Sequence, residues 1–486
     1  MLFNSIDFAI FLPVVFLLYW FVVNKNLNQQ NFLIVSASYL FYGWWDWRFL
    51  SLILFSTVVD YSIGLLLKTE YNQSKRKVLL WISIFVNLGF LGFFKYYNFF
   101  LDNFISAFSF FGTEIEANSL NIILPVGISF YTFQTLIYTI DVYKRKLEPT
   151  TNFIAFSAFV SFFPQLVAGP IERATHLLPQ FYKKRTFSYS NAVDGVRQIL
   201  WGLFKKMVIA DNCAEYANLI FNNSGDYSGS TLVLGALFFT FQIYGDFSGY
   251  SDIAIGTARL FGFDLMRNFA FPYFSRDMAE FWRRWHISLS TMFRDYLYIP
   301  LGGSRGGTWV KVRNTFIIFI VSGFWHGANW TFIVWGVLNA IYFLPILLAK
   351  KNRTHLDTVA QGRLMPNGKE AIKMLLTFAL TVMAWVFFRA ENISHAFSYL
   401  SGIFSKSIFT LPQGSDFIGT SLHPFTIFTL LGIFILFEWF GREHQYAISM
   451  TGLKWKSPFR YALYYAIATA IFWFGGKEQA FIYFQF

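Results

Sequence analysis

The sequence predicts an all-α, polytopic integral membrane protein with about 12 transmembrane helices and additional re-entrant or broken helices. The 486-residue chain is 55% hydrophobic and 22% aromatic but only 14% charged, whereas soluble domains carry about 25% charged residues. Its mean hydropathy is +0.44. Apolar runs of bilayer length recur along nearly the whole chain, and no alternating strand pattern accompanies them. This composition excludes a water-soluble enzyme.

The expected spans follow the apolar runs in order. These runs are 8–23, 31–45, 49–67, 78–94, 121–140, 152–168, 194–210, 231–244, 315–349, 374–388, 424–440 and 460–475. Because a span needs roughly 20 helical residues, the long run 315–349 is expected to form a helical hairpin. The stretch 152–170 returns to the side that it leaves, and 278–300 is too polar to cross. We expect both to be re-entrant or broken helices surrounded by protein or by a water-filled cavity.

Basic residues gather between these runs and bring the net charge to +12. The basic segments are 68–77, 141–150, 171–190, 259–313, 350–373 and 442–460. By the positive-inside rule these segments face the cytoplasm, and threading the spans on that basis places both termini outside. Orientation and contact with anionic lipid explain most of this charge, so no nucleic-acid partner is expected.

The chain shows no internal repeat, low-complexity tract or long soluble linker, so we expect one membrane domain over residues 1–486. Its single cysteine, Cys213, excludes an intramolecular disulfide framework and a cysteine-based metal cluster. Motifs for nucleotide phosphates, for zinc proteolysis and for a serine nucleophile elbow are absent from the sequence.

His326 is the first candidate site residue. It lies in Gly323-Phe-Trp-His-Gly-Ala-Asn-Trp330, and no acidic residue occurs between Asn314 and Leu348. An imidazole is costly to bury at membrane depth, which favours a functional role. Gly323 and Gly327 form a small-xxx-small pair typical of close helix packing, so a structural histidine bonded to a neighbouring helix is the alternative. Imidazole can accept a proton from a hydroxyl near neutral pH.

His286 is the second candidate and lies in FWRRWHISLSTMFRDYLYIPLGG, residues 281–303. On a helical wheel one stripe is aromatic and apolar: Trp282, Trp285, Leu289, Met292, Phe293 and Tyr296. Arg283, Ser290 and Arg294 line one flank, and Ser290, one helical turn after His286, can face the imidazole. An interfacial helix with Trp anchors and snorkelling arginines explains the same pattern without catalysis.

Two further polar blocks favour structural roles. Asp246 and Asp252 end an apolar run, but carboxylates at this spacing do not share a helix face, so we expect a polar network at a helix end and no metal site. The block 161–173 has Pro and Gly at the spacing of a broken segment, which favours a chain reversal.

Five stretches of the chain carry a family resemblance. They are residues 124–149 (LPVGISFYTFQTLIYTIDVYKRKLEP), 162–173 (FFPQLVAGPIER), 244–256 (YGDFSGYSDIAIG), 281–303, and 324–340 (FWHGANWTFIVWGVLNA). In these stretches the chain resembles the membrane-bound O-acyltransferases, in the bacterial branch typified by the membrane subunit of alginate O-acetyltransferase. The resemblance covers essentially the whole chain, and both histidine positions match the family pattern.

The resemblance implies a many-helix fold around a central tunnel, with His326 at its narrow middle and His286 as a second catalytic position. Candidates for positioning donor or acceptor are Ser290, Arg283, Arg294, Asn329 and Trp325. The implied activity is O-acetyl transfer with no bound cofactor. Acetyl-CoA and an acylated carrier protein remain alternative donors, and either would suit the basic cytoplasmic segments.

Relatives in this branch imply a bacterial inner-membrane protein that passes the acyl group to an extracytoplasmic acetyltransferase partner, and so to a polysaccharide. The tail 480–486 resembles aromatic C-terminal tails of related cell-wall systems, which makes Tyr483 a candidate acyl carrier. The chain ends in Phe rather than Tyr, and an interfacial aromatic anchor is the alternative for this tail. A polysaccharide transporter or flippase, or a non-catalytic scaffold of an envelope polysaccharide machine, is the competing function.

Overall fold

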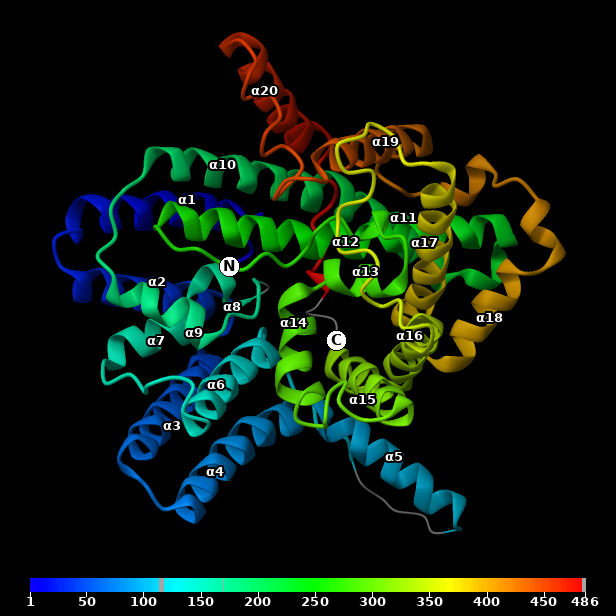
Figure 1. Cartoon of the computed structure of the whole chain (residues 1–486). Coiled ribbons are helices and arrows are strands. Elements are labelled where there is room, and N and C mark those ends of the chain that lie inside the picture. The colour runs from blue at the N-terminus through cyan, green and yellow to red at the C-terminus, as the bar shows by residue number, and fades with distance from the viewer. Residues whose placement is uncertain (113–117, 168, 483–486) are drawn as a thin grey trace. The chain divides into compact units, whose positions relative to one another are not determined.

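The regular structure of this protein is helical throughout the ranges that the computed structural model describes, residues 1–112, 118–167 and 169–482 (Figure 1). No β-strand occurs in these ranges, which confirms the all-α prediction. Within them, 6 helical stretches are long and apolar enough to cross a membrane: Leu27–Thr69, Gln73–Phe110, Gly229–Leu260, Trp330–Leu348, Gly368–Arg389 and Pro424–Gly441. The chain is therefore a multi-pass membrane protein, while the count of about twelve spans stays a prediction.

The chain forms two compact units. Unit 1 comprises Met1–Ala192 and Thr257–Met266, and unit 2 comprises Val193–Gly256 and Arg267–Phe486. Helices α10 (Tyr189–Leu203) and α12 (Gly229–Leu260) each continue from one unit into the other. Compact units of this kind do not define separate domains, so the single membrane domain over residues 1–486 stays a prediction.

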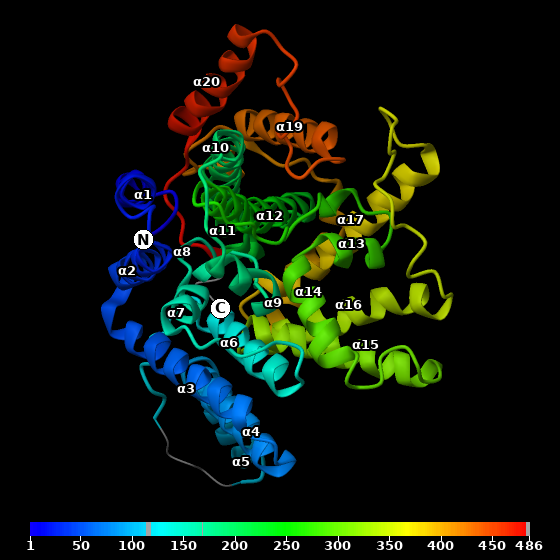
Figure 2. The same ribbon diagram turned by 60° about the vertical axis from the view of Figure 1, so that its left-hand side comes forward.

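Unit 1 is built from the first nine α-helices. These are α1 Ile6–Leu17, α2 Leu27–Asp46, α3 Leu50–Thr69, α4 Gln73–Leu91, α5 Tyr97–Phe110, α6 Ile128–Tyr143, α7 Phe153–Ser161, α8 Phe163–Leu166 and α9 Ala174–Leu177. Short turns of other helix types are η1 Leu18–Val22, η2 Trp47–Phe49, η3 Gly92–Tyr96 and η4 Leu178–Tyr182. Helices α3, α4 and α6 pack side by side (Figures 1 and 2).

A buried polar cluster joins these three helices. The Asp60 carboxylate accepts hydrogen bonds from the Ser83 hydroxyl at 2.5 Å, from the Asn87 amide at 2.8 Å and from the Thr139 hydroxyl at 3.0 Å. Asp60 is fully buried, and a buried carboxylate is tolerated where its oxygens find such donors. The cluster therefore fixes the register of α3 against α4 and α6.

Unit 2 holds the remaining helices: α11 Asp211–Asn222, α13 Met278–Arg284, α14 Ile287–Phe293, α15 Thr308–His326, α16 Trp330–Leu348, α17 Gly368–Arg389, α18 Ile393–Ile403, α19 Pro424–Gly441 and α20 Ser457–Phe474. Its shorter turns are η5 Phe204–Ala210, η6 Ser224–Asp226, η7 Pro272–Phe274, η8 Arg294–Tyr298, η9 Lys406–Phe409 and η10 Gly414–Phe417.

Helices α15 and α16 form the hairpin expected for the run 315–349 (Figure 1). Gly323 and Gly336 allow their close approach. A Cβ at Gly323 would collide with the backbone oxygen of Phe332, and one at Gly336 with that of Phe319. This is small-residue packing of two membrane helices.

The stretches 152–170 and 278–300 are broken helices, as the sequence analysis predicted. Helix α7 ends at Ser161 and α8 begins at Phe163, with Phe162 between them. In the second stretch the break falls between α13 and α14, where His286 adopts a left-handed conformation with φ 43° and ψ 56°. A single helical wheel over residues 281–298 is therefore wrong, because the chain turns at His286 and re-aims every side chain after it.

Candidate active site

His326 lies in an aromatic cage at the end of α15. It is the last residue of that helix and is only 3% exposed. Its ring centroid lies 4.9 Å from that of Trp325, 5.1 Å from Trp335 and 5.2 Å from Phe388. Because these rings come from α15, α16 and α17, three helices fix the position of the imidazole. The tight aromatic packing excludes bulk water from most of its surface.

His286 is held by an amide on the segment that follows α12. Its Nδ1 lies 3.0 Å from Asn268 Oδ1, and the same oxygen accepts hydrogen bonds from the Ser288 hydroxyl at 2.9 Å and the Ser288 backbone N–H at 3.3 Å. A backbone N–H can only donate, so the Asn268 atom facing it is the carbonyl oxygen. His286 Nδ1 therefore carries the proton, and in the neutral ring Nε2 is the basic nitrogen.

Both histidines contact the same indole. The Trp325 ring centroid lies 5.9 Å from the His286 ring and 4.9 Å from the His326 ring. On its other side His286 meets Phe247 edge-on at 4.7 Å. The fold of unit 2 thus brings together the two histidines that the sequence analysis selected.

A cavity of about 260 Å³ lies beside this pair in unit 2. Arg294 and Arg353 give it basic groups, while Trp282 and Phe319 belong to its largely apolar lining. The lining also includes Ser322, one helical turn before His326. The Trp282 ring lies 5.6 Å from the Trp335 ring, which in turn packs against His326. The lining of the cavity includes neither histidine, and Trp282 connects it to the aromatic cage of His326 through Trp335.

Two predicted positioning residues line this cavity, and a third contacts both histidine rings. Ser290 and Arg294 line it, and Trp325 joins the two histidine rings. The Ser290 hydroxyl donates to the backbone oxygen of Trp285 at 3.3 Å, and its backbone N–H donates to that of His286. Among the described hydrogen bonds, the serine that shares a partner with the His286 imidazole is Ser288, through the Asn268 oxygen.

The other two predicted positioning residues organise the backbone. Arg283 donates to the backbone oxygens of Asn352 at 2.7 Å and His355 at 2.6 Å, so it holds the loop after α16. Asn329 is the N-cap of α16, accepting from the Thr331 N–H at 3.0 Å and donating to the Glu391 backbone oxygen. Both contacts stabilise the frame of the site.

Sequence reasoning missed Asn268 and Ser288. Asn268 stands in an irregular segment, Phe261–Ala270, where no periodicity indicates which side chains face the site. Ser288 lies within residues 281–303, but its hydrogen bond to Asn268 depends on the turn at His286. No glycine or proline in the sequence indicates a turn at that position. The one available signal was an asparagine next to Arg267 in a segment that is otherwise mostly apolar.

Two consecutive buried lysines lie on η5, a π-helical turn. Lys205 pairs with Asp252 at 2.5 Å, and Lys206 pairs with Asp211 at 2.7 Å and Asp246 at 2.9 Å. The wider turn lets neighbouring lysines both point inward. Asp246 and Asp252 therefore lie inside α12 as partners of buried lysines, not at a helix end as expected. No group of three or more potential His, Cys, Asp or Glu metal ligands occurs in the described part of the chain.

The end of the described chain is buried in unit 2. Phe481 and Ile482 are at most 1% exposed, Phe481 packs on Tyr250 at 4.3 Å, and the Ile482 N–H donates to Asp246 at 2.7 Å. These two residues differ from the interfacial anchor considered above, because buried partners surround them. Tyr483, the candidate acyl carrier, lies outside the described residues.

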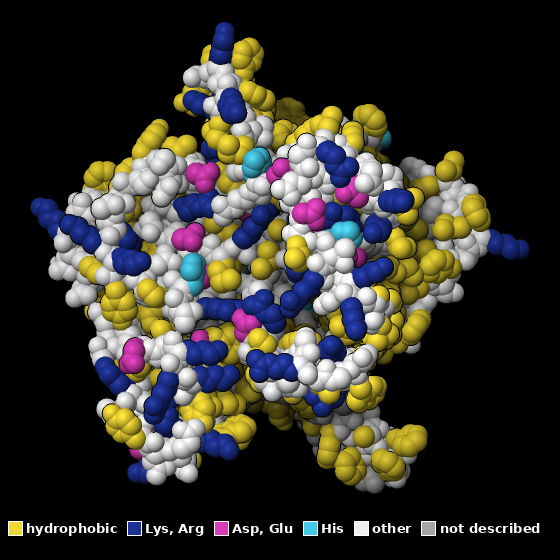
Figure 3. Space-filling view, viewed as in Figure 1, with side chains coloured by type: hydrophobic (Ala, Val, Ile, Leu, Met, Phe, Trp, Pro, Cys, Tyr) yellow, Lys and Arg dark blue, Asp and Glu magenta, His cyan; other side chains and the backbone are white. Residues whose placement is uncertain are grey.

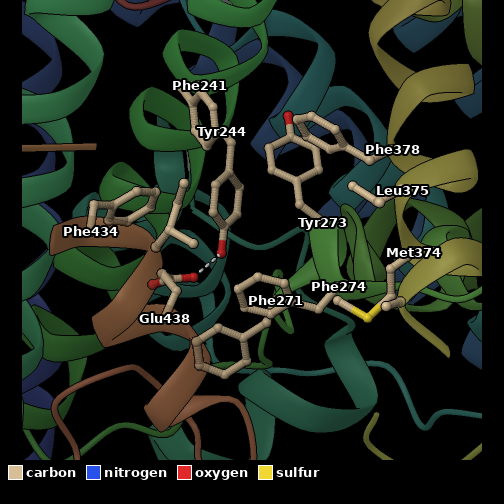
Figure 4. A pocket seen from close by; sticks show the side chains of 12 residues that line it. Phe241, Tyr244, Phe271, Tyr273, Phe274, Met374, Leu375, Phe378, Phe434 and Glu438 are labelled. Atoms are coloured by element: carbon tan, nitrogen blue, oxygen red, sulfur yellow. Dashed lines mark hydrogen bonds between the residues drawn. The ribbon is translucent and has the colours of Figure 1, made fainter. Parts of the chain in front are cut away.

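A second cavity of unit 2, about 380 Å³, has an apolar lining (Figure 4). Figure 4 shows Phe241, Tyr273 and Phe378 around it, with Glu438 at one side bonded to the Tyr244 hydroxyl at 2.5 Å. The other Glu438 oxygen accepts from the Trp201 indole N–H at 3.2 Å. Since both oxygens have donors, this carboxyl fixes α19 to α12 and α10 and adds no reactive group to the cavity.

Comparisons with known proteins identify the family of the chain. Residues 145–388 match the membrane-bound O-acyltransferase (MBOAT) family. A probable alginate O-acetylase, AlgI, of Azotobacter vinelandii is 40% identical over 93% of this chain and 87% of its own length. The peptidoglycan O-acetyltransferase of Helicobacter pylori is 34% identical over 100% of this chain and 98% of its own.

A more distant relative is the teichoic acid D-alanyltransferase of Bacillus subtilis, 28% identical over 46% of this chain and 58% of its own length. The chain belongs to the membrane-bound O-acyltransferase family. It is accordingly an acyltransferase, and the family resemblance of its motifs is confirmed.

Proposed function

We propose that this protein moves an acetyl group from a cytoplasmic thioester donor towards hydroxyls of an extracytoplasmic polysaccharide. The observation that carries the proposal is the shared contact of His286 and His326 with Trp325, beside a cavity with basic groups at one part of its lining. The relatives named for acyl transfer to alginate, peptidoglycan and teichoic acid support a cell-envelope polymer as the acceptor.

In this proposal His326 is the general base. It accepts the proton of the acceptor hydroxyl as the oxygen attacks the thioester carbonyl carbon. The new C–O bond forms, the C–S bond breaks, and the departing thiolate receives the proton from the imidazolium. Within the aromatic cage little water competes with the acceptor, which favours transfer over hydrolysis.

His286 would orient the hydroxyl. With its Nδ1 proton directed to Asn268, the neutral ring presents Nε2 as an acceptor. An oxyanion needs a hydrogen-bond donor, so His286 would serve that role only in its protonated form. Orientation of the acceptor is therefore the role that the neutral ring supports.

The donor would enter through the cavity beside α14. Arg294 and Arg353 suit the phosphates of acetyl-CoA or of a phosphopantetheine arm, and the apolar interior suits the uncharged thioester arm. Both donors share this chemistry. The protein itself needs no resident cofactor in this scheme.

The acetyl group would reach the polymer through a separate extracytoplasmic acetyltransferase in a bacterial inner membrane. Tyr483 is a candidate intermediate carrier, because it directly follows the buried Phe481 and Ile482. Peptide mapping of enzyme trapped with labelled donor would reveal acetyl-Tyr483. Label confined to other residues, or to none, would remove Tyr483 from the route.

The test of the proposed function is donor consumption by purified protein in nanodiscs with its partner. His326→Ala should lower the rate by ~10² to 10⁴ because it removes a positioned general base. His444→Ala is the matched control, an exposed histidine of the same unit, and should retain full activity. Equal rates for both variants at matched expression would exclude His326 as the base, and polymer transport without acetylation would favour the transporter alternative.

A further inference from the structure

A basic cavity of unit 1 lies away from every residue assigned a role above. Its volume is about 520 Å³, and its walls come from the segment after α9, the start of α10 and the end of α12. Four of its lining residues are Lys183, Lys184, Arg185 and Arg259. Small-molecule pockets span about 300–1,000 Å³, so this cavity is large enough for a ligand head group.

The positive charge of the cavity is only partly balanced. Asp264 is the one acidic side chain of its lining. His176 adds a positive charge, because hydrogen bonds to Asp264 and Glu172 raise the pKa of its imidazole to about 10. Its Nδ1 lies 2.8 Å from the Glu172 carboxylate and its Nε2 lies 3.5 Å from Asp264. The basic groups therefore outnumber the acidic ones where they face the cavity.

Buried contacts hold the walls in place. Arg185 is 7% exposed; it donates to Asn31 at 2.7 Å and lies 4.8 Å over the Phe263 ring. The Trp20 indole donates to the Leu260 backbone oxygen at 2.9 Å. Gln180 both donates to and accepts from the Asp264 backbone, at 2.9 and 2.8 Å. A preformed wall of this kind lowers the ordering cost of binding.

Neutral hydrogen-bonding groups complete the lining. Thr186, Ser188 and Asn191 lie beside the exposed Lys183 and Lys184 at the start of α10. Hydroxyl and amide donors together with lysine ammonium groups suit phosphate oxygens. A neutral sugar would leave the ammonium groups without a counter-charge. The same bias towards positive charge extends over the face of the protein in Figure 3, where Lys and Arg side chains are far more frequent than Asp and Glu.

We infer that this cavity is a phosphate-binding site, built to hold a phosphate-bearing head group. The group could belong to an anionic phospholipid or to a soluble phosphorylated molecule, and the chemistry recognised is the same in both. This site goes beyond the proposed function, because its lining belongs to unit 1 and shares no residue with the proposed donor cavity of unit 2.

The experiment compares two probes on the full chain in nanodiscs of neutral lipid. Short-chain phosphatidylglycerol, followed by native mass spectrometry, represents the lipid source. Coenzyme A, followed by calorimetry, represents the soluble source. Lys183→Gln/Lys184→Gln should weaken binding of the recognised probe roughly tenfold or more, since two charge-assisted contacts are lost. Lys68→Gln/Lys77→Gln removes the same charge from exposed positions of the same unit and should bind as the wild type does.

Loss of phosphatidylglycerol binding alone identifies a lipid-headgroup site, and loss of coenzyme A binding alone identifies a soluble phosphate ligand. Binding should also weaken with added salt, because the contact is ionic. The inference is overturned if neither probe binds the wild type. It is equally overturned if both double variants bind each probe alike. Since the His326→Ala variant keeps this site intact, its activity loss and the binding result are independent.

Discussion

At the scale of single residues, the two histidines have different neighbours. His286 is held by one asparagine oxygen that also receives the hydroxyl and the backbone N–H of Ser288. The His326 ring packs against Trp325, Trp335 and Phe388. A hydrogen bond to one ring nitrogen of a neutral imidazole selects its tautomer. Asn268 therefore fixes the tautomer of His286, and three aromatic rings fix the position of the His326 ring.

Asn268 is expected to act as a positioning residue through His286. Asn268→Leu should lower acetyl transfer roughly tenfold to a hundredfold, the range typical when a partner orienting an active imidazole is lost. Asn268→Asp, which keeps the acceptor oxygen, should restore much of the activity. The measurement is a double-mutant cycle of transfer rates with His286→Ala. The loss of rate in the double variant should be smaller than the product of the losses in the two single variants. Independent, multiplying effects would show that Asn268 acts elsewhere.

His176 gives the protein a stability term that depends on pH. The pKa of His176 is raised to about 10 in the folded protein, against about 6.5 in the unfolded chain. The folded state thus binds more protons between these values, so the contribution is complete below pH of about 6.5 and is lost as pH rises towards about 10.

The thermal midpoint of the wild type should therefore fall relative to that of His176→Gln as pH is raised from about 6 to 10. Differential scanning fluorimetry in detergent provides both curves. His444→Gln, an exposed histidine of unit 2, serves as the control and should follow the wild type. A constant difference between wild type and His176→Gln across this range would contradict the raised pKa.

At the scale of helices, the positions of helices and of helix breaks could be predicted from the sequence better than the contacts within the site. Apolar runs located the α15–α16 hairpin, and the proline and polarity of 152–170 and 278–300 indicated broken helices. The exact turn was not predictable. His286 adopts a left-handed conformation. Non-glycine residues rarely adopt it, so tertiary contacts must hold the backbone there. As a result, Ser288, which bonds to the same asparagine oxygen as His286, was overlooked.

The hairpin depends on Gly323. In Gly323→Ala the added methyl group would meet the backbone oxygen of Phe332, so α15 and α16 must separate. We expect a loss of about 1–3 kcal/mol in stability, as for overpacked cores, together with lower activity because His326 ends the same helix. The measurement is the thermal midpoint and the transfer rate of each variant.

Gly432→Ala is the matched control, because nothing lies within 4 Å of a Cβ built at that position of α19. Its midpoint should be unchanged or slightly higher, since alanine favours helix over glycine. If Gly323→Ala were as stable as Gly432→Ala, the close approach of the two helices would not be essential to the fold.

At the scale of the whole molecule, composition predicted a membrane protein and the five motif stretches carried the family resemblance, and the comparisons confirm both. Composition could not predict which buried charges meet. Lys205 and Lys206 read as part of an apolar run, yet each pairs with carboxylates from other segments. Likewise, nothing in the short tail indicates that Phe481 is buried against Tyr250. The pairing of Lys205 with Asp252, that of Lys206 with Asp246 and the contact of Phe481 with Tyr250 depend on long-range packing, which no local pattern encodes.

The whole protein is expected to carry acetyl groups from one face of a membrane to the other. In proteoliposomes of a single orientation, label from a thioester donor on the cytoplasmic-type face should appear on the partner enzyme at the opposite face. His326→Ala should reduce the label by ~10² or more, while His444→Ala should not. Label on the partner with the His326→Ala protein at wild-type rates would show transfer without this histidine.

The left-handed backbone of His286 has a consequence for protein engineering. A non-glycine residue with positive φ costs about 1 kcal/mol or more, and such strain persists where function maintains it. Asparagine and glycine tolerate this conformation better than alanine does, so His286→Asn and His286→Gly should fold more stably than His286→Ala while lacking the imidazole. A library selected for thermostability alone would therefore drift towards inactive proteins at this position. Selection for activity must accompany it if a more robust acyltransferase is the goal.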